Sequence, residues 1–228
     1  RQAIAKKFKR DNNLEYSPDE IVVSTGAKQS IANVVLSLVN EGDEVIILAP
    51  YWVSYLEIVK VAEGTPIIVN AGIENDFKIS GKELEAAITE KTKLIIFSTP
   101  CNPTGSVYSK EELADLAEVL KRHPNVVIIA DEIYEHINFT SKHESIAQFP
   151  EIKNQVVTIN GVSKAWAMTG WRLGYLGASK QIADACSKMQ GQFTSATCSI
   201  TQKAAIAAME ADPAVLKDMI KAFEGRRK

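Results

Sequence analysis

The feature that most constrains the fold is a series of apolar segments with strand character, separated by segments with helical periodicity. Each strand candidate is apolar nearly throughout, which is typical of strands buried on both faces of a sheet. Strands that alternate with helices predict an α/β domain with a mainly parallel sheet and helices on both faces. The strand candidates are residues 20–25, 44–50, 65–71, 93–100, 125–133, 156–161 and 172–179.

Helix start signals lie between several of these strand candidates. Ser80 with Glu83, and Ser109 with Glu112, have the spacing of a capping box, in which each side chain bonds the backbone N–H of the other residue. Residues 26–42 carry apolar side chains at helical spacing and end at a glycine. No internal repeat or flexible linker divides the chain, so we expect a single domain.

Composition and charge exclude several classes of function. The 228 residues are 46% hydrophobic, which is enough for a sizeable core. Lys and Arg number 26 against 28 for Asp and Glu, so we expect small-molecule or protein partners rather than nucleic acid. No apolar run reaches the roughly 20 residues of a membrane span, and residues 1–13 resemble an amphipathic helix rather than a signal peptide. We therefore expect a cytoplasmic protein.

The three cysteines are Cys101, Cys186 and Cys198, and they are scattered along the chain without metal-ligand spacing. We expect reduced thiols and no metal site. The chain begins with Arg1 and stops within a helical pattern, so we also expect it to be cut at both ends.

Loops that follow the strand candidates are where a ligand is expected, because open α/β sheets bind ligands at the carboxyl ends of their strands. Gly26 and Ala27 lie where a strand gives way to a helix, and free N–H groups at a helix N-terminus suit a phosphate. Trp52 could stack on a flat ring, and Asn102 lies in a rigid proline-rich turn. Each feature alone also has an ordinary structural explanation, as turn or core residues.

Charged residues in two further loops are harder to explain structurally. A buried strand delivers Asp131, with Tyr134 three residues later, and a carboxylate in that position requires a cation or a donor. Lys164 lies among small and apolar residues, where desolvation would favour a neutral amine that can attack a carbonyl. Arg172 could bind a phosphate through two nitrogens. A helix cap or surface salt bridges remain the alternatives for each residue taken singly.

These motifs together resemble the fold-type I pyridoxal-phosphate enzymes, and within them the class I aminotransferases of the aspartate aminotransferase type. The segment "GVSKAWAMTGWRLG", residues 161–174, resembles the lysine signature of that family, and "PYWVSY", "NPTG" and "DEIYEH" follow the family order. The resemblance implies a large domain with a mainly parallel, mixed sheet of seven strands. It also implies pyridoxal 5'-phosphate as cofactor and a homodimeric full-length protein.

The resemblance assigns roles around the cofactor ring. Lys164 resembles the lysine that forms a covalent link with the cofactor aldehyde and then moves the substrate proton. Asp131 resembles the partner of the pyridine nitrogen, and Tyr134 the phenol that bonds the ring oxygen. Trp52 resembles the indole stacked on the ring, and Asn102 the amide that contacts the ring oxygen and the substrate carboxylate.

The resemblance also implies a phosphate cradle, which comprises Gly26, Ala27, Lys28 and Arg172. In some relatives a serine hydroxyl at the position of Gly161 binds the phosphate as well, and Ser163 could replace it here. The small domain of the family, which carries the arginine for the substrate α-carboxylate, has no counterpart in this sequence, so we expect residues 1–228 to be the large domain of a longer protein.

The implied activity is transfer of an amino group from an amino acid to a 2-oxo acid, with aspartate and 2-oxoglutarate as the expected pair. Aromatic, alanine and prephenate aminotransferases share most of these motifs, as do carbon–sulfur lyases. A non-catalytic sensor with an aminotransferase-like domain is the alternative from another class. Trp52 favours the aspartate type, and the isolated chain is expected to be inactive without the small domain.

Overall fold

The computed structural model describes residues 1–139 and 142–227. These residues form the expected α/β architecture around one sheet. Seven strands are ordered β1-β7-β6-β5-β4-β2-β3 in this part of the chain. β7 is antiparallel to both of its neighbours, and the other neighbouring strands are parallel. All the strand predictions are confirmed, at β1 Ile21–Ser24, β2 Glu44–Ala49, β3 Thr65–Asn70, β4 Thr92–Ser98, β5 Val127–Asp131, β6 Val156–Gly161 and β7 Gly174–Gly177.

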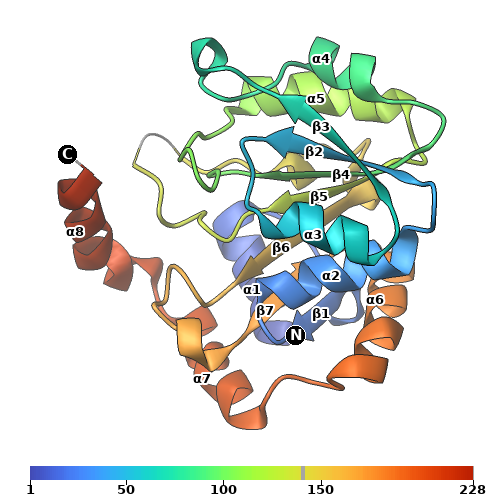
Figure 1. The fold of residues 1–228 in the computed structure, drawn as a ribbon. Helices are drawn as coiled ribbons and strands as arrows, with labels where there is room; N and C mark the ends of the chain where they lie inside the picture. The colour runs from blue at the N-terminus through green and yellow to red at the C-terminus, as the bar shows by residue number, and fades with distance from the viewer. Residues whose placement is uncertain (140–141, 228) are drawn as a thin grey trace.

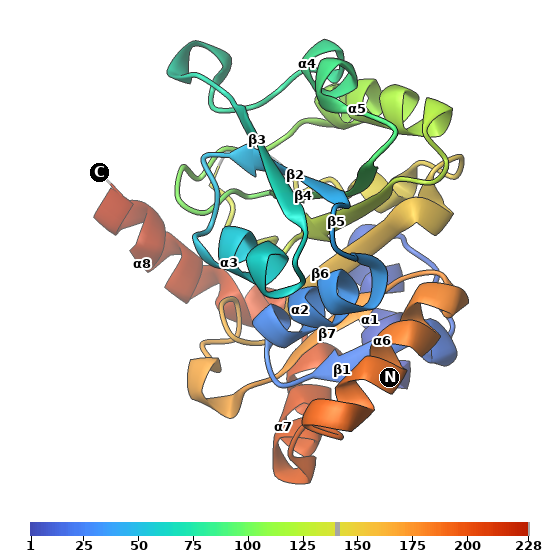
Figure 2. The same cartoon turned by 45° about the vertical axis from the view of Figure 1, so that its right-hand side comes forward.

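Helices cover both faces of this sheet, and the two layers are visible in Figures 1 and 2. One face packs against α1, α4, α5 and α7, and the other against α2, α3 and α6. The helices are α1 Gln2–Asn12, α2 Ala27–Leu38, α3 Ser54–Val61, α4 Gly81–Ala87, α5 Lys110–Arg122, α6 Lys180–Phe193, α7 Ser199–Glu210 and α8 Lys217–Arg227.

The strands divide their side chains between two hydrophobic cores, because successive residues of a strand point to opposite faces. In β5, Ile128 and Ala130 belong to the core beneath α1 and α5, and Ile129 belongs to the core beneath α2 and α3. This alternation places Asp131, the last residue of β5, on the same side of the sheet as Ile129, where Tyr55 of α3 contacts it.

The predicted helix caps are confirmed. Ser109 Oγ accepts a hydrogen bond from the backbone N–H of Glu112 at 3.2 Å, and the Glu112 carboxylate accepts one from the backbone N–H of Ser109 at 2.7 Å. Ser80 and Glu83 form the same reciprocal pair at the start of α4. α2 ends at Leu38, before the glycine that the sequence suggested, because Val39 turns into an extended conformation and is buried in the core.

The antiparallel strand β7 has a consequence for the site. β1, β2, β4, β5 and β6 all end at one edge of the sheet, and an antiparallel strand begins at that edge. Residues just before β7 therefore meet the loops that follow the parallel strands.

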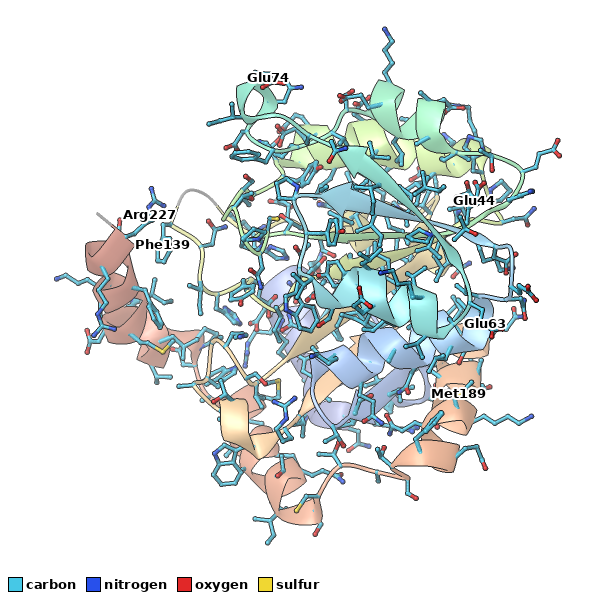
Figure 3. The ribbon with its side chains drawn as sticks, in the orientation of Figure 1. Glu44, Glu63, Glu74, Phe139, Met189 and Arg227 are labelled. Atoms are coloured by element: carbon cyan, nitrogen blue, oxygen red, sulfur yellow. The ribbon has the colours of Figure 1, made fainter. Side chains whose placement is uncertain are left out.

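α8 projects from the body of the domain in Figures 1 and 2. Arg227, near its end, lies with its guanidinium carbon 5.5 Å from the ring centroid of Phe139, and Figure 3 labels both side chains. All three cysteines are free thiols, as expected. Among residues 1–139 and 142–227, no helix combines the length and the apolar character that crossing a membrane requires.

Replacing Ser109 with Ala removes the cap of α5 and leaves a backbone N–H without its partner. We expect the free energy of unfolding to fall by about 1 kcal/mol, measured by urea denaturation. Ser199→Ala, at an exposed helix start that has no side-chain cap, is the matched control. Equal effects of the two substitutions would contradict a stabilising cap at α5.

Candidate active site

A pocket of about 210 Å³ lies at the edge of the sheet where the parallel strands end. All the site residues predicted from the sequence line it, except Gly26, which lies beneath the side chain of Arg172. Those lining residues are Ala27, Lys28, Trp52, Asn102, Asp131, Tyr134, Ser163, Lys164 and Arg172. Tertiary structure therefore brings together residues from loops that are far apart in the sequence.

Asp131 is the most buried charged group in the pocket, with 5% of its surface exposed. The hydroxyl of Tyr55 donates a hydrogen bond to Oδ2 at 2.7 Å, and the backbone N–H of Ile133 donates one to Oδ1 at 3.2 Å. Tyr55 comes from α3, on the face of the sheet to which Asp131 points. These two donors fix the orientation of the carboxylate.

Burial raises the pKa of Asp131 to about 6, although the hydrogen bonds from Tyr55 and Ile133 act in the opposite direction. No Lys, Arg or His within the described ranges forms a salt bridge with this carboxylate. The more distant charge of Lys164 lowers the pKa of Asp131, but less than burial raises it. A buried carboxylate without a salt bridge is unfavourable, so this end of the pocket suits a cationic or protonated group of a ligand.

An aromatic wall forms one side of the pocket. The rings of Trp52 and Tyr55 meet edge to face, with centroids 5.6 Å apart. Lys28 Nζ lies 4.9 Å from the centroid of the Trp52 ring, a cation–π distance. The wall offers a flat apolar surface beside the buried carboxylate.

Lys164 follows β6, and its Nζ lies 5.5 Å from the centroid of the Tyr134 ring. The sequence predicted that small and apolar neighbours would desolvate this amine, and that prediction is wrong for the described residues, because Lys164 is exposed. Its neighbours Val162 and Ala165 are buried, so they pack into the domain while the lysine side chain extends into the open pocket.

The other end of the pocket is formed by the N-terminus of α2. Within the described residues, no side-chain cap satisfies the backbone N–H groups of Ala27 and Lys28. Such free donors at a helix N-terminus bind anions. Arg172 stands beside them and is fixed by a 2.8 Å hydrogen bond from its Nη1 to the carbonyl oxygen of Thr169.

Two glycines permit this close packing. Gly26 has φ 92°, and a Cβ there would collide with Nη2 of Arg172. A Cβ at Gly161 would lie 2.8 Å from the carbonyl oxygen of Leu173, so the serine found here in some relatives does not fit without a backbone shift. Ser163 lines the pocket and is the nearby hydroxyl that this chain offers instead.

Four pocket residues were missed by the sequence analysis: Tyr55, Ser98, Ile133 and Thr169. Tyr55 had a detectable signal, since it follows Trp52 by three residues at a helix start and so lies on the same face. Ser98 is the last residue of β4, so its position at a strand end was a signal that it could line the pocket. Thr169 contributes a carbonyl oxygen to Arg172, which no residue-type pattern predicts.

A mixed sheet whose parallel strands end at a pocket with an exposed amine, a buried carboxylate and a helix N-terminus suited to anions defines a ligand-binding domain of the α/β class. Comparison with known families is more specific: the model for aminotransferase class I and II matches residues 1–228. This chain belongs to that family.

Relatives within the family carry related names. The chain is 49% identical to the probable aspartate/prephenate aminotransferase of Rickettsia bellii (strain RML369-C), with all of this chain and 57% of that protein covered. It is also 49% identical to the bifunctional aspartate aminotransferase and glutamate/aspartate-prephenate aminotransferase of Petunia hybrida, with all of this chain and 48% of that protein covered. The chain thus spans about half the length of these relatives.

Solved structures agree with this assignment. The aspartate aminotransferase of Rhizobium meliloti superposes with a TM-score of 0.97 at 42% identity, over 99% of this chain and 57% of that one. The aromatic aminotransferase of Pyrococcus horikoshii OT3 superposes with a TM-score of 0.95 at 35% identity, over 99% of this chain and 61% of that one. The seven-stranded fold is therefore shared by enzymes with different substrate names.

Replacing Asp131 with Asn should stabilise the ligand-free protein at neutral pH. The folded-state pKa lies above the unfolded value of 3.8, so the folded wild type loses stability as the pH rises from about 4 to about 6. The substituted amide does not ionise, and we expect the advantage of the variant to grow across this window to about 3 kcal/mol. Urea denaturation from pH 3.5 to 7.5 measures this difference, with the exposed Asp218→Asn as control. A variant less stable than the wild type at pH 7 would contradict the unpaired carboxylate.

Proposed function

We propose that this chain is the cofactor-binding part of an aminotransferase that uses pyridoxal 5'-phosphate to move an amino group from an amino acid to a 2-oxo acid. The observation that carries the proposal is the buried carboxylate of Asp131, which has no salt-bridge partner in the described residues and shares one pocket with Lys164 and Arg172. Family membership and the names of the relatives support the same reaction.

The residues present fit this cofactor at three points, which are its ring nitrogen at Asp131, its phosphate at Arg172 and its aldehyde at Lys164. Asp131 would pair with the ring nitrogen of the cofactor and keep that nitrogen protonated. The positive charge on the nitrogen would offset the energetic cost of burying the carboxylate. The phosphate would lie against Arg172 and the free N–H groups of Ala27 and Lys28. When bound, the cofactor supplies an aldehyde that links to amines and a cationic ring that accepts the electron pair left on a substrate carbon.

The remaining pocket residues orient these groups and move the proton. Trp52 provides a flat apolar surface for the ring, and Tyr134 and Asn102 would donate hydrogen bonds to the ring oxygen. Ser163 would add a hydroxyl at the phosphate end. The amine of Lys164 would first hold the aldehyde and then, when free, accept the proton from the substrate α-carbon at its Nζ.

Aspartate is the amino donor that the pocket favours, with 2-oxoglutarate as acceptor. The pocket has a second cation besides Arg172, because Lys28 is exposed and lies over the Trp52 ring. If Arg172 holds the phosphate, the ammonium of Lys28 remains for the side-chain carboxylate of a dicarboxylic substrate.

Prephenate and aromatic substrates are the second candidates. Prephenate occurs in the names of the Rickettsia bellii and Petunia hybrida relatives, and an aromatic aminotransferase shares the fold with a TM-score of 0.95. If the enzyme accepts both kinds of substrate, Lys28 would contact the carboxylate of the acidic substrate, and Trp52 would contact the ring of the other. Alanine aminotransferases, carbon–sulfur lyases and a sensor remain alternatives that a panel of half-reactions with single amino acids distinguishes.

The complete protein would include more than this domain. The relatives are about twice as long, so we propose that residues 1–228 are the large domain and that the arginine for the substrate α-carboxylate lies outside them. We further propose a homodimer in the cytoplasm, as the family resemblance implies. Gel filtration of the complete protein tests the dimer.

Lys164→Ala should abolish the covalent link between the protein and the cofactor aldehyde, because no other amine would hold it. The protein is incubated with pyridoxal phosphate, reduced with borohydride and analysed by intact mass. We expect one cofactor per wild-type chain and none on the variant, with Lys180→Ala, an exposed lysine outside the pocket, as control. A cofactor still attached to the Lys164→Ala protein would assign the link to another lysine.

Lys28→Met removes the proposed partner of the substrate side-chain carboxylate and keeps the length of the side chain. We expect KM for aspartate to rise about tenfold, which corresponds to about 1.4 kcal/mol, with little change for an aromatic amino acid. Steady-state kinetics of the complete protein with both donors measure this ratio. An equal rise for the two donors would place Lys28 at the phosphate rather than at the substrate side chain.

A further inference from the structure

The segment that presents Asp131 and Tyr134 to the pocket has a second, buried side. Asp131, the last residue of β5, accepts a hydrogen bond from Tyr55 of α3, whereas the carboxylate of the next residue, Glu132, contacts Ser145 and His143 and does not line the pocket. Glu132 is fully buried, and Glu135 has 6% of its surface exposed. Two carboxylates therefore lie in the domain interior directly behind two pocket residues.

Glu135 is held by the N-terminal helix α1. Its Oε1 forms a salt bridge with Nζ of Lys7, and its Oε2 accepts a hydrogen bond of 2.7 Å from Nδ2 of Asn12. Lys7 also donates to Oδ1 of Asn12 at 2.8 Å, which closes a three-membered network. Lys7 is itself only 2% exposed, so both partners of the salt bridge are buried. If one partner were removed, water could not readily solvate the charge of the other.

Glu132 is held by a different segment. Its Oε1 accepts a hydrogen bond of 2.6 Å from the hydroxyl of Ser145, and its Oε2 lies 3.0 Å from Nε2 of His143. The backbone N–H of Glu132 donates to the carbonyl oxygen of Ile159 on β6 at 2.9 Å. Both the side chain and the main chain of this residue are therefore fixed.

The ionisation of these groups agrees with paired charges. Burial raises the pKa of Glu135, but the charges of Lys7, His136 and His143 outweigh it and lower the pKa to about 2. Burial lowers the pKa of His143, but the neighbouring carboxylate of Glu132 outweighs it and raises the pKa above its usual value. Each buried carboxylate thus has a buried cation.

A metal ion is the other possible occupant of this region. Glu132, Glu135 and His143 place ligand atoms within 4.8 Å of one another. The ammonium of Lys7 already contacts Glu135, and a divalent cation there would face that positive charge. Salt bridges explain these residues without a metal.

We propose that Lys7 and His143 are positioning residues, which fix Asp131 and Tyr134 in the pocket by holding Glu135 and Glu132 on the reverse side of the same segment. Each pocket residue is followed directly by an anchored carboxylate. A shift of that segment would move the two pocket residues together. This inference deepens the proposed function and rests on it, because it assigns α1, more than a hundred residues away in sequence, to the geometry of the cofactor pocket.

The test uses Lys7→Met in the complete protein, loaded with pyridoxal phosphate. The visible absorption of the bound cofactor titrates with pH, and its midpoint reports the groups around the ring, including Tyr134. We expect the midpoint to move by about half a pH unit or more and kcat to fall roughly tenfold to a hundredfold, because small displacements of catalytic groups have large effects. Lys180→Met, which removes an exposed salt bridge to Asp184, is the matched control.

A combination with Tyr134→Phe separates positioning from general destabilisation. If Lys7 acts through Tyr134, the midpoint shift caused by Lys7→Met should largely disappear in the Tyr134→Phe background. A shift of equal size in both backgrounds, or no shift beyond that of Lys180→Met, would overturn the proposal.

Lys7→Met removes the ammonium from the buried Glu135 and leaves the imidazole of His136, 3.3 Å from Oε1, as its neighbour, and a loss of roughly 10 °C in Tm is expected. If that variant does not fold, Lys7→Met combined with Glu135→Gln removes both charges and should restore most of the Tm. The double variant should still shift the midpoint, since the anchor is missing, and an unshifted midpoint would overturn the proposal as well.

His143 is tested in the same way by a conservative pair of variants. His143→Gln keeps a donor towards Glu132 and should shift the midpoint less than His143→Ala. Equal shifts would overturn its positioning role. If the wild type itself shows no cofactor absorption that depends on Lys164, the proposed function fails. If it does, and the Lys7 and His143 variants resemble the control, only this inference fails.

Discussion

The buried carboxylate of Asp131 is the interaction on which the pocket depends. It ends a central strand, where the sheet excludes water, and two hydrogen bonds from Tyr55 and Ile133 orient it without neutralising it. A charge in that position lowers the stability of the ligand-free domain, and it also makes the pocket bind a cation more tightly. The site is therefore one where stability and ligand binding oppose each other.

The strand direction of β7 assembles the other end of the pocket. A wholly parallel sheet would place Arg172 at the opposite edge, far from the N-terminus of α2. Arg172 precedes β7 in the chain. Because β7 is antiparallel, its first residues lie at the end of the sheet where the parallel strands finish, and Arg172 therefore lies beside Gly26. The same arrangement brings the carbonyl oxygen of Leu173 so close to Gly161 that a side chain there would require a backbone shift.

The segment after β5 joins these features to the interior. Asp131, Ile133 and Tyr134 line the pocket, whereas Glu132 and Glu135 lie on the reverse side and meet buried cations. The pocket is thus supported by α1 and residues 143–145 as well as by its own loops. Structures named for an aspartate and for an aromatic aminotransferase share this fold, so the fold alone does not distinguish between these substrate names.

The sequence by itself determined the secondary structure and the chemistry of the site. Apolar runs of strand length predicted all seven strands, and capping boxes predicted the starts of α4 and α5, because these signals are local. The motifs at strand ends and the family resemblance named nine of the thirteen residues that line the pocket. Only the tertiary structure decided the exposure of Lys164, the bond from Tyr55 to Asp131 and the pairing of Lys7 with Glu135. The last two contacts join residues more than 70 positions apart, so local sequence patterns do not reveal them. The exposure of Lys164 depends on everything packed around its side chain, so the neighbouring residues in the chain do not determine it.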